Sequence, residues 1–540
     1  MQNRKLNILL PLMFSLVLVV GMIIGFRLRE STWSKPPVAA RGDYNRLEEI
    51  LSIIESKYVD TFDRQKAMDG LIEDLVTQLD PHSFFIPASE LKEVNESLEG
   101  NFEGIGIEFY ILHDTIVVVT PISGGPSEAL GIMSGDKIIK IEDTVVAGTG
   151  ITNNDVVKKL RGKKGTKVKV SIQRNQESEL LDFVITRDKI PIASLDAAYM
   201  VDKETGYIRL TRFSGTTYKE FAEGVKRLKE QGMKRLILDL RQNPGGYLEA
   251  AVHILDELID DEKLVLYTEG RSYRRKEYRA RLDGLFEKGP LVVLIDEGSA
   301  SASEIVAGAV QDLDRGLVVG RRSFGKGLVQ EQYNLRDGSA LRLTVARYYT
   351  PSGRSIQKPY SNGKEKYYNE ITERFYHGEY QSADSVIQND SLKYYTLSGK
   401  VVYGGGGIMP DIFVPIDSLT DLQTLAQVRS YIPEFVLDRF SNNREFFEQF
   451  PSLDAFADGY YMPDSLFADF IRAARQQGLQ TDDQTLIGLR HKIKVLLKAQ
   501  IARQEWKNEG FYRIYNTMDK TFLKAYEALD SLHAAGGRKP

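Results

Sequence analysis

The chain of 540 residues contains no cysteine. This absence excludes disulfide bonds, thiolate nucleophiles and cysteine-based metal sites. Positive charge is not in excess either, because 71 lysines and arginines face 75 acidic residues and the formal net charge is −4. A nucleic-acid partner is therefore not expected, since no basic surplus would meet the phosphates. The length exceeds what one hydrophobic core supports, so several domains are expected.

The sequence patterns that mark common hydrolases are also missing. The six histidines stand in no recognisable triad setting, and neither G-x-S-x-G nor H-E-x-x-H occurs. The usual interpretations as an α/β-hydrolase or a zinc protease therefore lack support. We expect no metal and no cofactor.

One long apolar run is present, at the N-terminus. It covers residues 6–26, follows Lys5 and is closed by Arg27. As a helix it would span about 30 Å, the thickness of the hydrocarbon core of a bilayer. A cleaved signal peptide is the alternative, but no small-residue cleavage site ends the run. We predict an uncleaved anchor at residues 1–30 in an inner membrane, with the body on the exported, periplasmic or extracytoplasmic side.

The remaining chain changes texture several times, which indicates domains. Short β-runs separated by glycines predict a compact mostly-β module, and a later alternation of strands and helices indicates an α/β layer architecture. The predicted segments are a linker at 31–42, an N-terminal helical segment at 43–88, the mostly-β module at 89–190, an α/β core at 191–416 with a polar insertion at about 355–403, and a helical C-terminal extension at 417–540.

A run of small residues holds the first candidate catalytic side chain. Gly298–Glu304 reads GSASASE and lies where a buried strand turns into a helix. A nucleophile there, such as Ser301, gains from backbone N–H groups at the helix start, which stabilise an oxyanion. The alternative is a plain helix cap formed by Ser301 or Ser303, with Glu304 favouring the helix dipole.

A serine nucleophile needs a base, and Lys326 is the remaining candidate. It lies between two glycines at the start of an apolar β-like run. Burial would lower its pKa from about 10.4 toward roughly 7–8, which suits a general base. In a strand, Gln330 would share a face with Lys326 and could orient the amine. The alternative is an ordinary lysine at a strand edge.

Two further glycine-rich segments have competing interpretations. Gly320–Lys326 nearly matches a phosphate-binding loop, but Gly327 replaces the magnesium-coordinating Ser or Thr, and a strand-like segment follows instead of a helix. The nucleotide-binding interpretation therefore fails. Gln242–Gly246 follows one strand and precedes a helix. Its glycine N–H groups suit either an oxyanion hole or a plain tight turn.

Taken together, these segments resemble the carboxy-terminal processing, or tail-specific, proteases. The matching motifs occur in the family's order between about residues 44 and 415, and several motifs in register are far more specific than one. They are LDPHS (79–83), GIGI (104–107), DLRQNPGG (239–246), GSASASE (298–304), GKGLVQ (325–330), YTPSG (349–353) and GIMPD (407–411). Asp296 stands where relatives often have asparagine.

The resemblance implies an α/β protease core of crotonase-like fold that works with a Ser–Lys dyad. The dyad logic is acylation of the serine, with the lysine first as base and then as acid to the leaving amine. The implied site residues are the nucleophile Ser301, the base Lys326, Gln330 that positions the lysine, and as oxyanion donors Ala302 with Gly245 or Gly246.

The resemblance also implies that the module at 89–190 is an inserted PDZ domain. Its carboxylate-binding loop would consist of Gly104, Ile105, Gly106 and Ile107, whose backbone N–H groups grip a substrate C-terminus. The substrate would add as a strand and place an apolar C-terminal residue in a pocket. In relatives this domain also gates the active site. The alternative for the loop is an ordinary β-turn.

The function implied is that of a serine endopeptidase that cleaves exported proteins near their C-termini. One alternative is a catalytically silent PDZ-containing scaffold, against which the intact Ser301, Lys326 and Gln330 argue. A weaker alternative is an acyl-thioester enzyme, for which no adenine or pantetheine site is discernible. Expected partners are peptides with apolar C-termini and, through the anchor, the membrane. The extension at 417–540 would serve homo-oligomerisation, an adaptor contact or packing.

Overall fold

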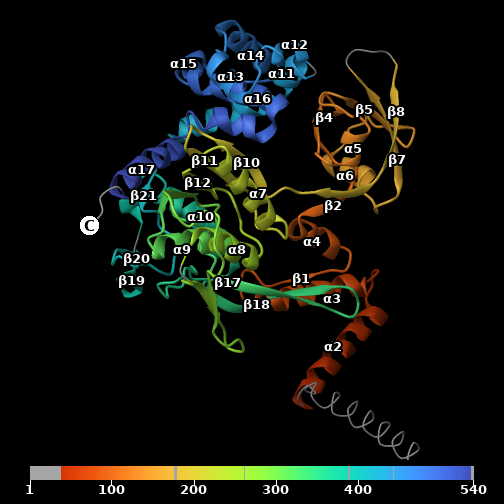
Figure 1. Ribbon diagram of the computed structural model, residues 1–540. Helices are drawn as coiled ribbons and strands as arrows, with labels where there is room; N and C mark the ends of the chain where they lie inside the picture. Colours follow the sequence, from red (N-terminus) through yellow and green to blue (C-terminus); the bar gives the residue numbers. More distant parts are fainter. Residues whose placement is uncertain (1–37, 175–178, 261, 387–388, 442, 537–540) are drawn as a thin grey trace, which may run out of the picture. The chain divides into compact units, whose positions relative to one another are not determined.

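The computed structural model describes residues 38–174, 179–260, 262–386, 389–441 and 443–536 (Figure 1). The predicted anchor at residues 1–30 lies outside these ranges. Among the described helices, none combines the length and the apolar character that a membrane crossing requires. The chain divides into two compact units, one up to Leu75 and one from Val76 onward.

The first unit consists of helices α2 (Val38–Lys57) and α3 (Arg64–Thr77), the latter ending just past the division. The Arg64 guanidinium lies 2.8 Å from a Glu48 carboxylate oxygen and 3.1 Å from one of Glu55. Helix α2 starts within the predicted linker at 31–42, so that boundary was wrong. The reason is local, because residues 38–41 include two alanines, the strongest helix formers.

A six-stranded sheet forms the centre of the second unit. Its strands lie in sequence order, and all pairs are parallel except the first, which confirms the predicted mixed α/β core. The strands are β10 (Leu195–Met200), β11 (Thr205–Leu210), β12 (Arg235–Asp239), β15 (Leu291–Ile295), β16 (Leu317–Gly320) and β21 (Ile412–Phe413).

Helices cover both faces of this sheet because its strands are apolar on both sides. In β12, Leu236 and Leu238 join one buried cluster and Ile237 joins another. The first cluster also takes residues from α7 (Thr217–Glu230), α8 (Leu248–Leu258) and α9 (Ala302–Asp312). The second takes residues from α17 (Lys520–Gly536), the last helix of the chain.

A second, antiparallel sheet carries the segment that follows the lysine candidate. Figure 1 shows its two longest strands, β17 and β18, side by side as a hairpin. The strands are β1 (Phe84–Ile86), β13 (Leu264–Glu269), β14 (Lys276–Arg279), β17 (Leu328–Asn334) and β18 (Ala340–Tyr349).

The compact mostly-β module lies in sequence between β1 of the antiparallel sheet and β10 of the parallel sheet. Its buried core is almost wholly isoleucine and valine, as expected for pleated, half-buried strands. Its elements are α4 (Leu91–Glu99), β2 (Asn101–Gly104), β3 (Ile107–Leu112), β4 (Thr115–Pro121), α5 (Pro126–Ala129), β5 (Lys137–Ile141), β6 (Thr144–Val145), α6 (Asn153–Leu160), β7 (Lys167–Gln173), β8 (Leu181–Thr186) and β9 (Asp188–Pro191).

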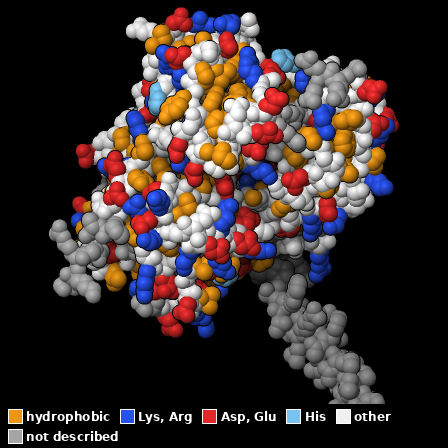
Figure 2. All heavy atoms as spheres, turned by 45° about the horizontal axis from the view of Figure 1, so that its top comes forward, with side chains coloured by type: hydrophobic (Ala, Val, Ile, Leu, Met, Phe, Trp, Pro, Cys, Tyr) orange, Lys and Arg blue, Asp and Glu red, His pale blue; other side chains and the backbone are white. Residues whose placement is uncertain are grey.

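The insertion and the C-terminal extension complete the second unit. The insertion contains α10 (Lys364–Tyr376), two 3₁₀ turns (Ala383–Ser385, Asp390–Leu392), β19 (Lys393–Tyr395) and β20 (Val401–Tyr403). The extension is helical, as predicted, with α11 (Leu419–Phe440), α12 (Arg444–Phe447), α13 (Leu453–Gly459), α14 (Asp464–Gln476), α15 (Asp483–Gly488) and α16 (Arg490–Tyr515) before α17. On the face drawn in Figure 2, acidic and basic side chains are interspersed.

Candidate active site

The parallel sheet brings the serine segment and the glycine turn together. Strands β12 and β15 are neighbours, and the segments with Gly245 and Ser301 follow their carboxyl ends, where open α/β sheets place their sites. The two segments touch. A Cβ atom on Gly245 would lie 2.7 Å from the carbonyl oxygen of Ala300 and 2.8 Å from Cβ of Ser301. Only glycine allows this approach, which the tight-turn interpretation alone would not require.

Of the three serines in GSASASE, one is accessible. Ser299 and Ser303 are fully buried, and their hydroxyls donate to the carbonyl oxygens of Leu240 (2.8 Å) and Asn243 (2.9 Å). Ser301 is only partly buried and has φ +54° and ψ −113°, a region that residues other than glycine rarely occupy. Such strain clusters at functional sites. Ser301 is therefore the accessible and strained serine of this segment, and it occupies the N-cap position of α9.

Glu304 joins the serine segment to the lysine segment. Its carboxylate is fully buried and accepts hydrogen bonds from the backbone N–H groups of Ser301 (2.8 Å), Gly325 (2.7 Å) and Lys326 (2.8 Å), and from the Ser323 hydroxyl. Burial raises the pKa of Glu304 to about 7, although these donors oppose the rise. The sequence had suggested only a dipole role for this residue. Its place in the GSASASE motif was the available signal.

Lys326 is held as a desolvated amine. Its Nζ donates to Oε1 of Gln330 at 2.8 Å, so the predicted shared face is present. Burial, together with the nearby Arg342 guanidinium, lowers the pKa of Lys326 to about 8, although Asp80 and Glu304 act in the opposite direction. The Tyr348 hydroxyl lies 3.1 Å from the carbonyl oxygen of Ser301 and 2.7 Å from that of Lys326, so it bridges the two segments.

In this structure the serine and the lysine are neighbours without a direct bond. Among the hydrogen bonds of the described residues, none joins the Ser301 hydroxyl to Nζ of Lys326. The backbones of the two residues are linked through Glu304 and Tyr348 instead.

His82 supports the site through its backbone, a role that sequence reasoning missed. Its carbonyl oxygen accepts a hydrogen bond from Nε2 of Gln330, which fixes the amide so that Oε1 faces Lys326. Its ring bonds the Tyr367 hydroxyl at 2.8 Å, and burial lowers the ring pKa to about 3. The LDPHS motif was the available signal, but a backbone contact leaves no residue-type pattern of its own.

Two backbone donors remain available beside Ser301. The N–H of Gly245 donates to Oδ1 of Asn243 at 2.9 Å and is therefore occupied. The N–H groups of Gly246 and Ala302 have no acceptor among the hydrogen bonds of the described residues. Of the two glycines named from the sequence, Gly246 is thus the one with a free donor.

Asp296 organises the loop in front of Ser301. Its carboxylate accepts from the backbone N–H of Gln242 (2.9 Å), from Nε2 of Gln242 (2.8 Å) and from the N–H of Gly298 (3.0 Å). Burial, together with the neighbouring Glu297, raises its pKa. An aspartate at this position therefore ties the glycine turn to the serine loop.

The GIGI loop lies at the start of an edge strand. Strand β3 pairs only with β4 within the described sheet, so its other edge is open to an added strand. Ile105 is 2% exposed, Gly106 has φ +73°, and Ile107 begins β3 and packs against the module's core. The four residues named from the sequence are therefore contiguous at one end of the open edge.

No cluster of metal-ligating side chains accompanies these sites. Within the described ranges, no three or more histidine and acidic side chains gather to hold an ion.

Comparisons with known proteins agree with this geometry. Residues 204–363 match the model of peptidase family S41, residues 104–184 that of the PDZ domain, and residues 422–507 a family of unknown function. The carboxy-terminal-processing protease of Bartonella bacilliformis is 38% identical over 317 residues, which make up 58% of this chain and 72% of that protein.

Two further relatives complete the comparison. The carboxy-terminal processing protease CtpB of Bacillus subtilis is 35% identical over 331 residues, or 60% of this chain and 68% of its own. Among solved structures, the photosystem II D1 C-terminal processing protease is similar at 28% identity, covering 69% of this chain and 86% of its own with a TM-score of 0.36. The chain belongs to the carboxy-terminal processing proteases of peptidase family S41 and is a serine-type peptidase with a PDZ domain.

Proposed function

We propose that this protease works with a dyad of Ser301 and Lys326 and trims exported proteins near their C-termini. The observation that carries the proposal is the amine of Lys326, which is buried, bonded to Gln330 and assigned a pKa of about 8. A general base works best when its pKa lies near the operating pH. A structural surface lysine would keep its usual pKa of about 10.4.

The proposed reaction begins with the neutral amine of Lys326. It takes the proton of the Ser301 hydroxyl as that oxygen attacks the scissile carbonyl carbon. The carbonyl oxygen becomes negatively charged and accepts hydrogen bonds from the N–H groups of Ala302 and Gly246. The Lys326 ammonium then protonates the leaving amine, and water cleaves the acyl-enzyme with Lys326 again as base. Because Ser301 and Lys326 are not hydrogen-bonded at rest, substrate binding must bring the two side chains together.

The PDZ domain is proposed to select the substrate. Gly104, Ile105, Gly106 and Ile107 would bind the free C-terminal carboxylate of a protein with an apolar last residue, while the preceding residues pair with the open edge of β3. Main-chain hydrogen bonds supply affinity in this mode and side-chain pockets supply specificity. The open edge supports this assignment.

The test compares peptide cleavage by mass spectrometry. The substrate is a peptide with an apolar C-terminal residue, offered as the free acid and as the amide. Wild type should trim the acid faster than the amide, and Ser301→Ala and Lys326→Ala should abolish trimming. Lys226→Ala, an exposed lysine on α7, serves as the control and should behave as wild type. Near-full activity of Lys326→Ala would refute the dyad. Binding of the peptide without cleavage by wild type would favour the silent scaffold.

Membrane attachment is a separate proposal that concerns the N-terminal run. Residues 6–26 are long and apolar enough to anchor the protein in an inner membrane, with the protease domain on the exported side. After alkaline carbonate extraction of membranes, the full chain should sediment and a form that starts at residue 38 should stay in solution. Release of the full chain by carbonate would contradict the proposal.

A further inference from the structure

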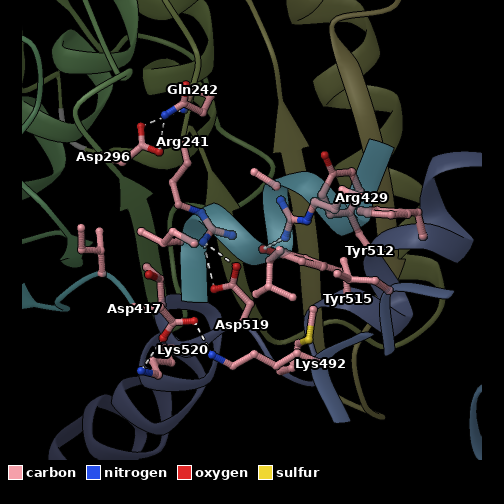
Figure 3. Close-up of a pocket in the computed structure, with 18 of the residues that line it drawn as sticks. Arg241, Gln242, Asp296, Asp417, Arg429, Lys492, Tyr512, Tyr515, Asp519 and Lys520 are labelled. Carbon is pink, nitrogen blue, oxygen red and sulfur yellow. Dashed lines mark hydrogen bonds and ion pairs between the residues drawn. The ribbon is translucent and has the colours of Figure 1, made fainter. Parts of the chain in front are cut away.

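A cavity opens beside the loops that carry Gln242 and Asp296. It has a volume of about 690 Å³, within the range of small-molecule sites. Its walls come from the carboxyl edge of the parallel sheet and from α11, α16 and α17 (Figure 3). Ser301 and Lys326 do not line it, so it is distinct from the peptidase site. Gln242 and Asp296 line it and also hold the loop in front of Ser301.

The charged lining of the cavity is net positive. Six of its residues are arginine or lysine and three are aspartate. Most of the cations are already neutralised, for example Arg241 by Asp519 and Lys492 by Asp417. Arg429 differs from them. Arg429 is exposed and has no carboxylate partner among the described residues; its guanidinium donates to the Tyr515 hydroxyl at 3.4 Å and lies 5.6 Å from the centroid of the Tyr515 ring. Figure 3 shows Arg429 reaching into the cavity from α11.

A buried side-chain amide without a hydrogen-bond partner also lines this cavity. Gln500 on α16 is 6% exposed and lines the cavity, and its Nε2 has no hydrogen-bond partner in the structure. A buried donor left unpaired destabilises the fold, and native proteins therefore contain few of them. Gln500, whose Nε2 is unpaired, and Arg429, which has no carboxylate partner among the described residues, both offer N–H donors to this cavity.

The rest of the lining is apolar. Leu425 and Ile432 from α11 and Leu496 from α16 are almost fully buried and face this space. An apolar wall with a few convergent donors is typical of sites for molecules with a hydrophobic body and one polar end. One guanidinium and one amide provide donors for the two oxygens of a single carboxylate, whereas the other cations of the lining are already paired with carboxylates.

We infer that this cavity binds a monocarboxylate with an apolar body. The carboxylate accepts from Arg429 and from Nε2 of Gln500, and the body packs against Leu425, Ile432 and Leu496. Two sources share this chemistry, namely a fatty acid and the C-terminus of a short apolar peptide.

Calorimetric titration of the full-length Ser301→Ala protein, which cannot cleave the probes, tests the inference. The probes are decanoate and the peptide N-acetyl-Ala-Val-Leu, and their uncharged counterparts are decanol and the peptide amide. At least one acid should bind about tenfold more tightly than its uncharged counterpart, the size of effect expected of one charge-assisted hydrogen bond. The acid that binds more tightly identifies the source.

Variants then locate the site. Arg429→Gln and Gln500→Leu should each weaken binding of that acid about tenfold. Arg439→Gln is the matched control, because Arg439 is also exposed on α11 but lies outside the cavity. Gln500→Leu should melt no earlier than the parent, since it removes an unpaired buried amide. Binding of neither acid, or binding that is unchanged by Arg429→Gln, would overturn the inference. The latter result would also assign the peptide to the PDZ groove.

Discussion

At the scale of single residues, the site depends on a lysine kept out of water. The cationic form of a buried amine loses its hydration. Among the described residues, the Lys326 amine donates a hydrogen bond to the amide oxygen of Gln330 and forms no ion pair with a carboxylate. Under the proposed mechanism, desolvation makes Lys326 a usable base. The same desolvation lowers the free energy of unfolding. Both consequences can be measured.

The pH dependence of cleavage should follow the titration of Lys326. Because only the neutral amine accepts a proton, kcat/KM should rise with pH and reach half its maximum near pH 8. Arg342→Gln removes a cation that lowers this pKa, so the midpoint should move to higher pH. Arg336→Gln, an exposed arginine in the β17–β18 turn, should leave the midpoint unchanged. A midpoint that Arg342→Gln leaves in place would contradict the assigned base.

The lowered pKa of Lys326 should also make the free energy of unfolding depend on pH. Between about pH 8 and 10.5 the folded state binds fewer protons than the unfolded state, so wild-type stability should rise with pH across this window. At pH 7 Lys326 is charged in both states, so the folded state carries the full free-energy cost of burying the cation. Lys326→Met should therefore be more stable there by about 3 kcal/mol, and the difference should shrink toward pH 10.5.

Thermal unfolding across this pH range measures the effect. Lys219→Met, an exposed lysine on α7, provides the control and should differ little from wild type at any pH. A lower melting temperature for Lys326→Met at pH 7 would show that the amine stabilises the fold.

At the scale of elements, the glycine turn after β12 has to pass very close to the start of α9. Gly245 has φ +92°, and an added Cβ would press on the Ala300 carbonyl and the Ala302 N–H. A side chain at this position would displace the backbone donors beside Ser301. The absence of a side chain at Gly245 thus allows the turn to lie beside these backbone donors.

Gly245→Ala should lower kcat/KM at least about 100-fold, the loss that follows removal of one oxyanion donor. Gly459→Ala is the matched control, because a Cβ atom there meets nothing within 4 Å. Rates from peptide cleavage should be read beside melting temperatures, so that a folding defect is recognised. Wild-type kcat/KM in Gly245→Ala would exclude the turn from the oxyanion hole.

The elements were largely predictable, and the contacts between them were not. Hydrophobic periodicity placed the strand before Ser301 and the helix after it, and strand geometry placed Gln330 beside Lys326. Periodicity cannot report that Glu304 accepts hydrogen bonds from a segment about twenty residues away, because two of these donors, Gly325 and Lys326, are backbone N–H groups. The same holds for His82, whose carbonyl reaches Gln330 across 248 residues. The helix start at Val38 was missed because weak turn signals outweighed its alanines.

At the scale of the whole molecule, the C-terminal extension is part of the core of the protease. Helix α17 buries Phe522, Ala525 and Leu529 against the sheet face that contains Ile237 and Leu294. Among the interpretations left open from the sequence, packing is the one seen here. The proposed oligomer or adaptor contact stays a prediction.

Leu529→Ala should destabilise the protein by about 2–5 kcal/mol, because it leaves a cavity against the sheet. Leu523→Ala on the same helix should cost less than about 0.5 kcal/mol, since Leu523 is 40% exposed. Denaturant unfolding of the two variants provides the comparison. Equal effects would mean that α17 does not complete the core.

The position of α17 also affects how the chain acquires its fold during synthesis. The last strand of the sheet ends at Phe413, yet the residue that seals its second face, Leu529, comes 116 residues later. At about 5–20 residues per second the ribosome needs about 6–23 s for that interval. During this interval, one apolar face of the sheet is not yet covered by α17. A nascent chain in this state therefore exposes apolar surface that the completed domain buries.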